Sequence, residues 1–350
     1  MSPLGRREFF ADATGGLFLC TLGGQKVLSN EKADVESLAT GIPEPPKVAA
    51  AREQGLYSDS GADGIVFAQD TPGRREYWIK AEPVKWNIVP SKRDEMMGKK
   101  VKGKTTFDAY AYRAYSPGFG APLGPATIPG PLIECNVGDT VVVHFQNKLK
   151  IPVSIHPHGI QYSVDMDGAY KGKYTDPGGF VQKNDVFDYT WEAIPESEGA
   201  WMYHDHGPMD PLPIYKGLFG PMIVRDPSKP QPTREFFTAF HSFQPVATGI
   251  DKAFWCINGR AYTGNTTTAV SNNGDDVAFH VYALDDDFHT FHIHGHRWRD
   301  PSGRVVDNVT LGPGDMYTAR FTEDNPGRWL YHCHVFSHLH AGMSAWYVVN

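Results

Sequence analysis

The chain has 350 residues, which is enough for two domains of ordinary size, each with a buried core. Hydrophobic residues make up 41% of it and charged residues 21%, and this balance excludes a disordered chain. The formal net charge of −7 argues against broad electrostatic binding to nucleic acid or anionic lipid, and no apolar run is long enough to span a bilayer. We therefore expect no nucleic-acid partner and no membrane span.

The N-terminus is interpreted as an export signal. An arginine pair, Arg6-Arg7, precedes a weakly apolar and glycine-rich stretch over residues 13–24, which resembles a twin-arginine signal. This predicts a signal over residues 1–30 and a periplasmic or secreted protein, whereas a chance arginine pair in a disordered N-terminus is the alternative. Residues 31–74 have scattered prolines and no clear periodicity, so we expect a linker or an irregular arm there.

Short strands are predicted from Arg75 onward. Residues 76–80 and 84–89 alternate large apolar with polar side chains, and Gly138-Asp139 forms a turn before a strand over 140–145. The 36 glycines, 27 prolines and 13% aromatic residues are typical of many short strands joined by turns. No amphipathic helical pattern extends beyond a few turns, so the fold class is predicted to be all-β.

An internal repeat divides the chain into two copies of one β domain. Three segments of the first copy match three segments of the second in the same order. The matched pairs are 134–145 with 270–281, His156-Pro-His158-Gly159 with His292-Ile-His294-Gly295, and Trp201-Met-Tyr-His204-Asp-His206 with Trp329-Leu-Tyr-His332-Cys-His334. We expect domains over residues 75–227 and 233–350, joined by the proline-containing segment between them.

Each copy contains two His-x-His pairs. Side chains alternate along a strand, so the two histidines of a pair share one face and can bind one metal ion or two neighbouring ions. Imidazole suits zinc as well as copper, so a single pair does not identify the metal. Four such pairs at matching positions predict a metal site built from both copies.

The second copy has further metal-binding residues around Cys333. This cysteine lies between His332 and His334, with His338 and Met343 downstream and His289 upstream. Two imidazoles, one thiolate and a weak axial thioether form the ligand set of blue, electron-transfer copper. The first copy has Asp205 where the second has Cys333, and Val153 where the second has His289, so only the second copy is expected to build this site.

These motifs resemble those of the multicopper oxidases, and in size and layout the chain resembles the two-domain small laccases. The resemblance covers roughly residues 75–350. It is carried by His156-Pro-His158-Gly, Trp201-Met-Tyr-His204-Asp-His206, His289-Thr-Phe-His292-Ile-His294 and His332-Cys333-His334 with His338 and Met343. It implies an all-β fold of two cupredoxin-like Greek-key β-barrel domains.

The resemblance also implies a copper ligand set, with about four copper ions per subunit. The type 1 ion takes His289, Cys333, His338 and Met343. The type 2 ion takes His156 and His292. The type 3 pair takes His158, His204, His206, His294, His332 and His334.

The activity that the resemblance implies is laccase-like. A small reducing substrate, such as a phenol or an aromatic amine, loses single electrons at the type 1 site, and dioxygen is reduced to water at the trinuclear cluster. Proton-donating acids are expected at Asp167 and Asp307, and an electron-donating tyrosine at Tyr162. An ordinary loop aspartate or a packed tyrosine is the alternative interpretation of each.

Other functions remain open at this point. A metal-ion oxidase acting on ferrous or cuprous ions has the same ligands. A copper nitrite reductase also has two such domains, but that family carries its blue site in the first domain, where this chain has Asp205. A copper carrier has no need for a cysteine between two cluster histidines.

The expected oligomer is a homotrimer. The histidine pairs of the first domain must face those of the second, and the segment joining the two domains is only a few residues long. Contact between domain 1 of one subunit and domain 2 of the next closes into a ring, as in the small laccases. Cys135 and Cys256 lie in different domains, and either a disulfide after export or two buried thiols is consistent with the sequence.

Overall fold

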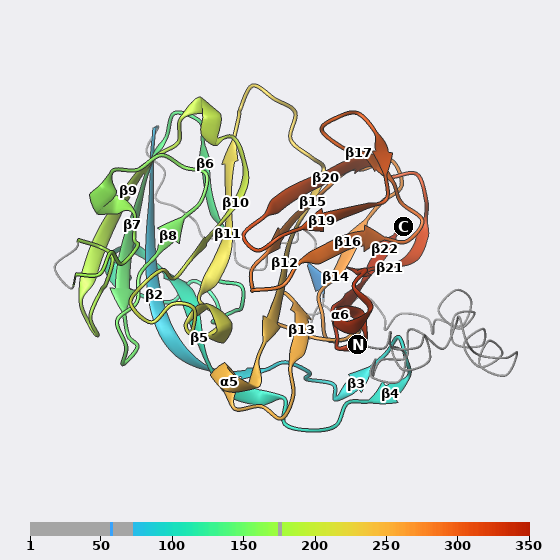
Figure 1. The fold of residues 1–350 in the computed structure, drawn as a ribbon. Helices are drawn as coiled ribbons and strands as arrows, with labels where there is room; N and C mark the ends of the chain where they lie inside the picture. Colours follow the sequence, from blue (N-terminus) through green and yellow to red (C-terminus); the bar gives the residue numbers. More distant parts are fainter. Residues whose placement is uncertain (1–56, 59–72, 174–176) are drawn as a thin grey trace, which may run out of the picture. The chain divides into compact units, whose positions relative to one another are not determined.

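The computed structural model describes residues 57–58, 73–173 and 177–350. The predicted export signal and almost all of the predicted linker over 31–74 lie outside the described residues. Within the described part the chain consists mainly of strands, and the all-β prediction is confirmed (Figure 1). No helix in that part is long and apolar enough to cross a bilayer.

Two four-stranded sheets form the N-terminal half, with strand orders β5-β2-β7-β9 and β6-β11-β10-β8. The first contains β2 (Arg74–Asn87), β5 (Thr106–Tyr115), β7 (Thr140–Asn147) and β9 (Val186–Glu192). The second contains β6 (Ile133–Asn136), β8 (His156–Pro157), β10 (Gly199–His204) and β11 (Phe219–Arg225). Strand β2 pairs in parallel with β7 and antiparallel with β5, so this sheet is mixed.

The C-terminal half repeats this arrangement with sheets β13-β12-β15-β20 and β1-β14-β22-β21-β16-β19. The first contains β12 (Arg234–Phe243), β13 (Phe254–Ile257), β15 (Asp276–Ala283) and β20 (Met316–Thr322). The second contains β1 (Tyr57–Ser58), β14 (Thr268–Ser271), β16 (His289–Ile293), β19 (Asn308–Leu311), β21 (Gly327–Cys333) and β22 (Ser344–Val349). Strand β1 lies within the segment predicted to be a linker and pairs in parallel with β14.

The remaining elements are short. Two further strand pairs are β3 (Arg93–Asp94) with β4 (Lys99–Lys100), and β17 (Trp298–Arg299) with β18 (Val305–Val306). The helices are α5 (Pro245–Thr248) and α6 (Phe336–His340), with 3-10 turns η2 (Pro117–Phe119), η3 (Val164–Met166), η4 (Pro195–Ser197) and η5 (Ile214–Lys216).

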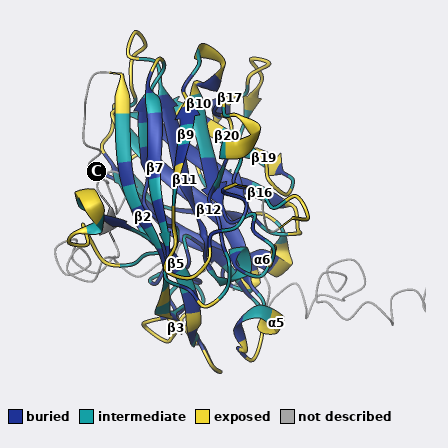
Figure 2. Ribbon diagram, turned by 90° about the vertical axis from the view of Figure 1, so that its left-hand side faces the viewer, coloured by how far each residue is buried: buried dark blue, intermediate teal, exposed yellow. Residues whose placement is uncertain are grey.

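The burial of each strand follows its sequence pattern. Strand β2 alternates buried and less buried residues in its first half, as expected for a sheet with one face on a core. Strands β11 and β15 are apolar almost throughout and are buried on both faces. In Figure 2 the dark blue strands, which include β7 and β11, run through the interior, and the exposed residues lie mostly in loops and at strand ends.

The internal repeat is visible in the turns before β7 and β15. The amide of Asp139 donates to the carbonyl of Asn136 over 3.0 Å, and the amide of Asp275 donates to that of Asn272 over the same distance. In each turn the aspartate carboxylate then accepts the asparagine amide over 2.8 Å. The matched sequences therefore fold into matched turns.

The two halves share an apolar core. One buried cluster lies within the N-terminal half and another within the C-terminal half. A third combines residues of both, for example Phe107, Met202 and Phe219 with Phe243 and Phe254. Burial of this many large side chains stabilises the contact between the two halves.

A partly buried ion-pair network also joins the halves. The Arg225 guanidinium contacts the carboxylates of Glu134 and, at 2.8 Å, Glu235. His280 Nε2 lies 3.0 Å from the same Glu235 carboxylate. Burial opposes ionisation of this carboxyl, but its hydrogen bonds to His280 and Arg225 outweigh that cost and lower the pKa of Glu235 to about 2.

Cys135 and Cys256 are separate buried thiols. The sequence left open a disulfide between them, and the structure excludes it. Burial raises the pKa of both thiols, which keeps them protonated and unreactive.

Candidate metal centres

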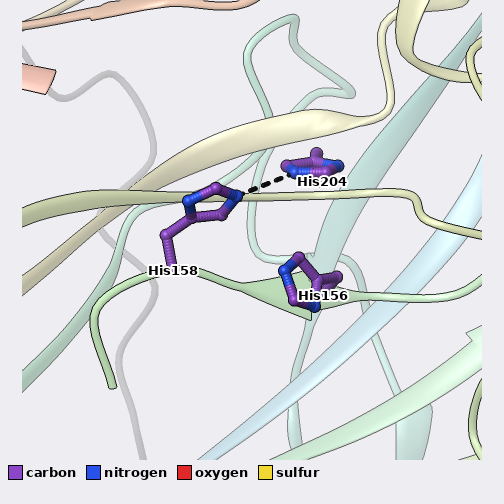
Figure 3. Close-up of side chains that lie close together, drawn as sticks. All are labelled: His156, His158 and His204. Carbon is purple, nitrogen blue, oxygen red and sulfur yellow. Dashed lines mark hydrogen bonds between the residues drawn. The ribbon is translucent and has the colours of Figure 1, made fainter. Parts of the chain in front are cut away.

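Three histidines of the N-terminal half converge at the pairing of β8 with β10. His156 on β8 lies opposite His204 on β10, and His158 follows two residues after His156. The Nε2 atoms of His158 and His204 are 3.0 Å apart (Figure 3). The three residues have one ligand atom each within 4.8 Å of one another, so they can bind the same metal ion or adjacent ions.

The C-terminal half builds the same arrangement. His292 on β16 lies opposite His332 on β21, and the Nε2 atoms of His294 and His332 are again 3.0 Å apart. These three residues also have ligand atoms within 4.8 Å of one another. The two predicted half-sites therefore have the same geometry.

A glycine and a tryptophan hold each His-x-His pair in place. Gly159 and Gly295 both have φ of 71°, a conformation that an L-residue with a side chain rarely adopts. A Cβ atom on Gly159 would meet the Trp201 ring at 1.9 Å, and one on Gly295 would meet the Trp329 ring at 2.8 Å. The motif therefore needs glycine because the backbone turns sharply against an indole ring.

Backbone carbonyls fix the orientation of four of these imidazoles. In each case Nδ1 is hydrogen-bonded to a main-chain oxygen, which leaves Nε2 for a metal. The pairs are His156 with Asp167 at 2.7 Å, His292 with Asp307 at 2.7 Å, His204 with Asp205 at 2.7 Å, and His332 with Cys333 at 2.8 Å.

The environment favours the neutral form of four of the six convergent histidines. Burial, followed by the proximity of other histidines, lowers the pKa of His158 and His294 to about 4 and that of His204 and His332 to about 3. A neutral imidazole has a free lone pair, so the protonation state at neutral pH is the one that a metal requires.

His206 and His334 lie next to these two groups. The His206 ring is 5.3 Å from the His156 ring, and the His334 ring is 5.4 Å from the His292 ring, measured between centroids. Neither belongs to the three residues whose ligand atoms lie within 4.8 Å. The structure thus brings six of the eight predicted cluster histidines into two convergent groups and places the other two at their edges.

A third group surrounds Cys333 in the C-terminal half. Its Sγ atom lies 3.7 Å from His289 Nδ1 and 3.6 Å from His338 Nδ1. Met343 is fully buried, and its carbonyl accepts the Cys333 amide over 3.2 Å, so the backbone brings it beside the cysteine. The predicted type 1 residues therefore lie together.

The surroundings of the Cys333 thiol favour its deprotonated form, the thiolate. Burial raises its pKa, but hydrogen bonds from His289 and His338 and from the Thr290 amide outweigh burial and lower the pKa of Cys333 to about 6. The same contacts act on His289, whose pKa rises to about 9 despite burial because Asp285 and Cys333 accept from it.

The corresponding place in the N-terminal half contains no thiol. Asp205 occupies the position of Cys333, and its carboxylate accepts the amide of Ser154 over 2.7 Å, as Cys333 Sγ accepts that of Thr290. The amide of Asp205 donates to the carbonyl of Leu218 over 3.1 Å, so Leu218 stands where the other half has Met343. Burial raises the pKa of Asp205 to about 7.

The predicted acids and tyrosine lie near the histidines in different ways. The Asp167 carboxylate is 3.0 Å from His156 Nδ1 and 2.7 Å from Lys171 Nζ. Asp307 touches His292 only through its carbonyl, and its exposed side chain accepts from Asn308. The Tyr162 ring lies 5.9 Å from the His156 ring, between centroids.

Two residues that contact the Cys333 group were not predicted from the sequence. The Asp285 carboxylate lies 3.0 Å from His289 Nε2 and is 2% exposed. Trp255 stacks on His338, with ring centroids 3.7 Å apart and 14° between the planes. Asp285 lies four residues before His289, and this short spacing could have indicated their contact. No sequence pattern connects Trp255 with His338.

The donor sets of these groups fit copper. A buried thiol with a lowered pKa and two imidazoles, with a methionine in the same buried cluster, suit blue copper better than zinc. The neutral histidine groups suit copper as well. His289, Cys333 and His338 would hold one ion, and the groups around His156 and His292 would hold others.

Comparisons with known proteins agree with this geometry. Two sequence profiles, both described as multicopper oxidase, match residues 125–229 and 237–350, together more than half of the chain. A probable nitrite reductase-hydroxylamine oxidoreductase fusion protein of Kuenenia stuttgartiensis is 32% identical over 64% of this chain and 28% of its own length. Mouse hephaestin is 29% identical over 85% of this chain and 31% of its own length.

The fold comparison agrees too. A solved structure described as a multicopper oxidase has a TM-score of 0.65 and 22% sequence identity, covering 83% of this chain and 98% of that chain. This confirms the predicted cupredoxin-like fold. The chain spans about three tenths of the length of these two relatives, so it is similar to only a part of each.

Proposed function

The chain belongs to the multicopper oxidase family, and we propose that it is a laccase-like oxidase. It would couple the one-electron oxidation of phenols, aromatic amines or related donors to the four-electron reduction of dioxygen to water. The proposal places it with the two-domain small laccases.

The observation that carries the proposal is the pair of matched histidine groups beside one cysteine group. Nitrite reduction needs few histidine ligands, so it leaves a surplus of histidine pairs unused, and a copper carrier has no need for a cysteine between two of these histidines. A copper nitrite reductase would moreover need its blue site in the first half, where Asp205 and Val153 replace the ligands. Dioxygen reduction uses all three groups.

Copper bound by these residues would supply one-electron transfer at the Cys333 group and dioxygen reduction at the histidine groups. About four ions per subunit would be held by the residues assigned from the sequence. The chain itself supplies the connection, because Cys333 is joined by peptide bonds to His332 and His334. A short path of covalent bonds therefore links the two kinds of group.

Asp167 and Asp307 are proposed to serve the proton supply to the histidine groups. The Asp167 carboxylate faces His156, whereas the Asp307 carboxylate faces Asn308 and solvent. Asp167→Asn should therefore slow turnover more than Asp307→Asn, with copper content unchanged in both. Wild-type turnover in both variants would mean that neither carboxylate serves the proton supply.

The direct test is dioxygen consumption by the copper-loaded protein. With a phenolic donor, an oxygen electrode should record uptake, and peroxide should not accumulate because the product is water. Nitrite in place of dioxygen should give no turnover. Nitrite turnover without oxygen uptake would replace this proposal with a reductase.

A metal-ion oxidase is the second candidate, and one observation favours it. Asp285 contacts His289 directly, and the acidic run continues through the exposed Asp286 and Asp287. Carboxylates beside a type 1 ligand suit a cationic electron donor. Ferrous ion and a phenol should be compared at equal concentration, and a strong preference for ferrous ion would favour this candidate.

We also propose a head-to-tail homotrimer. Within the described residues no hydrogen bond or ring contact joins the histidines of one half to those of the other, and β8 lies apart from β16 in Figure 1. Contact between subunits would bring the two groups together. Mixing a His156→Ala variant with a His332→Ala variant should restore some activity after subunit exchange, and a copper-loaded active monomer would contradict the ring.

Export by the twin-arginine route is proposed from Arg6-Arg7. Replacing both arginines by lysine should hold the protein in the cytoplasm, as fractionation would measure.

A further inference from the structure

Trp255 is the largest side chain in contact with the type 1 histidines that is not fully buried. Cys333, His289 and Met343 are 0% exposed, and His338 is 4% exposed. Trp255, on β13, is half-buried. Its ring therefore lies between these buried ligands and the surface.

The contact between Trp255 and His338 is close and parallel. The ring centroids are 3.7 Å apart and the planes differ by 14°, which is full face-to-face overlap. Trp255 also meets His289, with centroids 5.8 Å apart at 68°. One indole thus touches both imidazoles that flank the Cys333 thiol.

Two exposed aromatic side chains lie close in sequence to the type 1 histidines. Phe288 and Phe336 are 54% and 47% exposed, and they are the exposed aromatic side chains among the large hydrophobic residues of the described part. Phe288 immediately precedes His289, and Phe336 begins α6, the helix that contains His338. The Phe336 ring contacts His334 and His340, with centroids 5.5 Å and 6.3 Å apart, so Trp255 remains the half-buried ring that contacts both type 1 imidazoles.

We propose that Trp255 is the residue through which aromatic electron donors deliver their electrons to the type 1 group. This rests on the proposed oxidase function and specifies its donor contact. The donor stacks against the indole edge and loses one electron, which passes by way of Trp255 to the His338 imidazole and on to cupric ion held by the Cys333 group. A phenolic donor releases its proton to water, and Trp255 itself is unchanged overall.

The chain offers a matched control. Trp78 stacks on His144 with centroids 4.6 Å apart and 20° between the planes, and it is also half-buried. His144 belongs to none of the three convergent groups. Trp78→Leu therefore removes an equivalent stack far from the proposed electron path.

The test is anaerobic reduction of the blue absorption by a phenol, followed by stopped flow, with the reduction potential measured in parallel. Trp255→Leu should keep the blue band and slow bleaching about tenfold, the scale of one lost aromatic contact. Trp255→Phe should fall between Trp255→Leu and the wild type, and Trp78→Leu should match the wild type. Dioxygen uptake by the same wild-type preparation with the same phenol tests the oxidase proposal separately.

Three results would overturn the inference. The first is bleaching at the wild-type rate in both Trp255 variants. The second is slower bleaching that is fully explained by a measured change in reduction potential. Trp255 would then affect only the potential of the copper site and not the path of the electron. The third is loss of the blue band in Trp255→Leu together with an unslowed Trp255→Phe, which would make the indole a packing residue.

Discussion

The two halves of this chain are built alike at the histidine groups and differ at a few positions beside them. Both have a 3.0 Å Nε2 to Nε2 contact, a glycine at φ 71° and a tryptophan against that glycine. The C-terminal half then has Cys333 with two histidines, whereas the N-terminal half has Asp205 held by backbone amides. One scaffold thus supports a metal group in one copy and a buried carboxylate in the other.

The comparison shows which contact the backbone provides whatever side chain lies between the two histidines. In both halves a backbone amide points at the side chain between the two histidines, so the hydrogen bond is kept whether oxygen or sulfur accepts it. Electron transfer needs the sulfur and its two imidazoles, and those belong to the second half alone. The two halves therefore differ in their proposed chemistry because of a few side chains and not because of the fold.

The largest effect is expected from removing the sulfur. Cys333→Ser should abolish the blue absorption and lower oxidase turnover at least about 100-fold, equal to about 2.7 kcal/mol in activation free energy. Asp205→Asn, at the matching position, should leave the blue band unchanged. Visible spectra and oxygen uptake measure both, and a blue Cys333→Ser variant would refute the assignment.

The next effect is expected on stability, at the glycine that follows each His-x-His pair. Gly159→Ala and Gly295→Ala both place a Cβ atom at positive φ, which costs roughly 1–2 kcal/mol. Gly159→Ala adds the closer clash, 1.9 Å from Trp201 against 2.8 Å from Trp329. Urea unfolding should show the greater loss for Gly159→Ala, and the reverse order would mean that the Trp201 ring moves freely.

The ion-pair network between the halves predicts a pH effect. The folded-state pKa of Glu235, about 2, lies below its ordinary value of 4.5, so its stabilisation is present above pH 4.5 and is lost as pH falls toward 2. Glu235→Gln should lower the unfolding free energy by about 2–3 kcal/mol at pH 7 and by much less at pH 2. A constant difference between the two proteins across this range would exclude the linkage.

The smallest effect is expected at the axial position. Met343→Leu gives the second half the residue that the first half has at Leu218. The blue colour should persist, and the type 1 reduction potential should rise because a weak sulfur ligand is lost. Redox titration measures it, and an unchanged potential would count against Met343 as a ligand.

The sequence predicted the histidine groups because strand alternation and the repeat determine which side chains share a face. It predicted the Cys333 group because His338 and Met343 follow Cys333 closely and because His289 precedes the repeated His292-Ile-His294 pair. It did not predict the equivalence of Leu218 and Met343, since the loops before β11 and β22 differ in length. Nor did it predict Trp255, whose contact with His338 arises only when β13 meets α6.

The most direct test of the central claim is anomalous X-ray diffraction at the copper absorption edge from crystals of the copper-loaded protein. We expect a peak between His289, Cys333 and His338, further peaks at the histidine groups, and none beside Asp205. A copper peak at Asp205, or none at Cys333, would contradict the assignment of electron transfer to the second half alone.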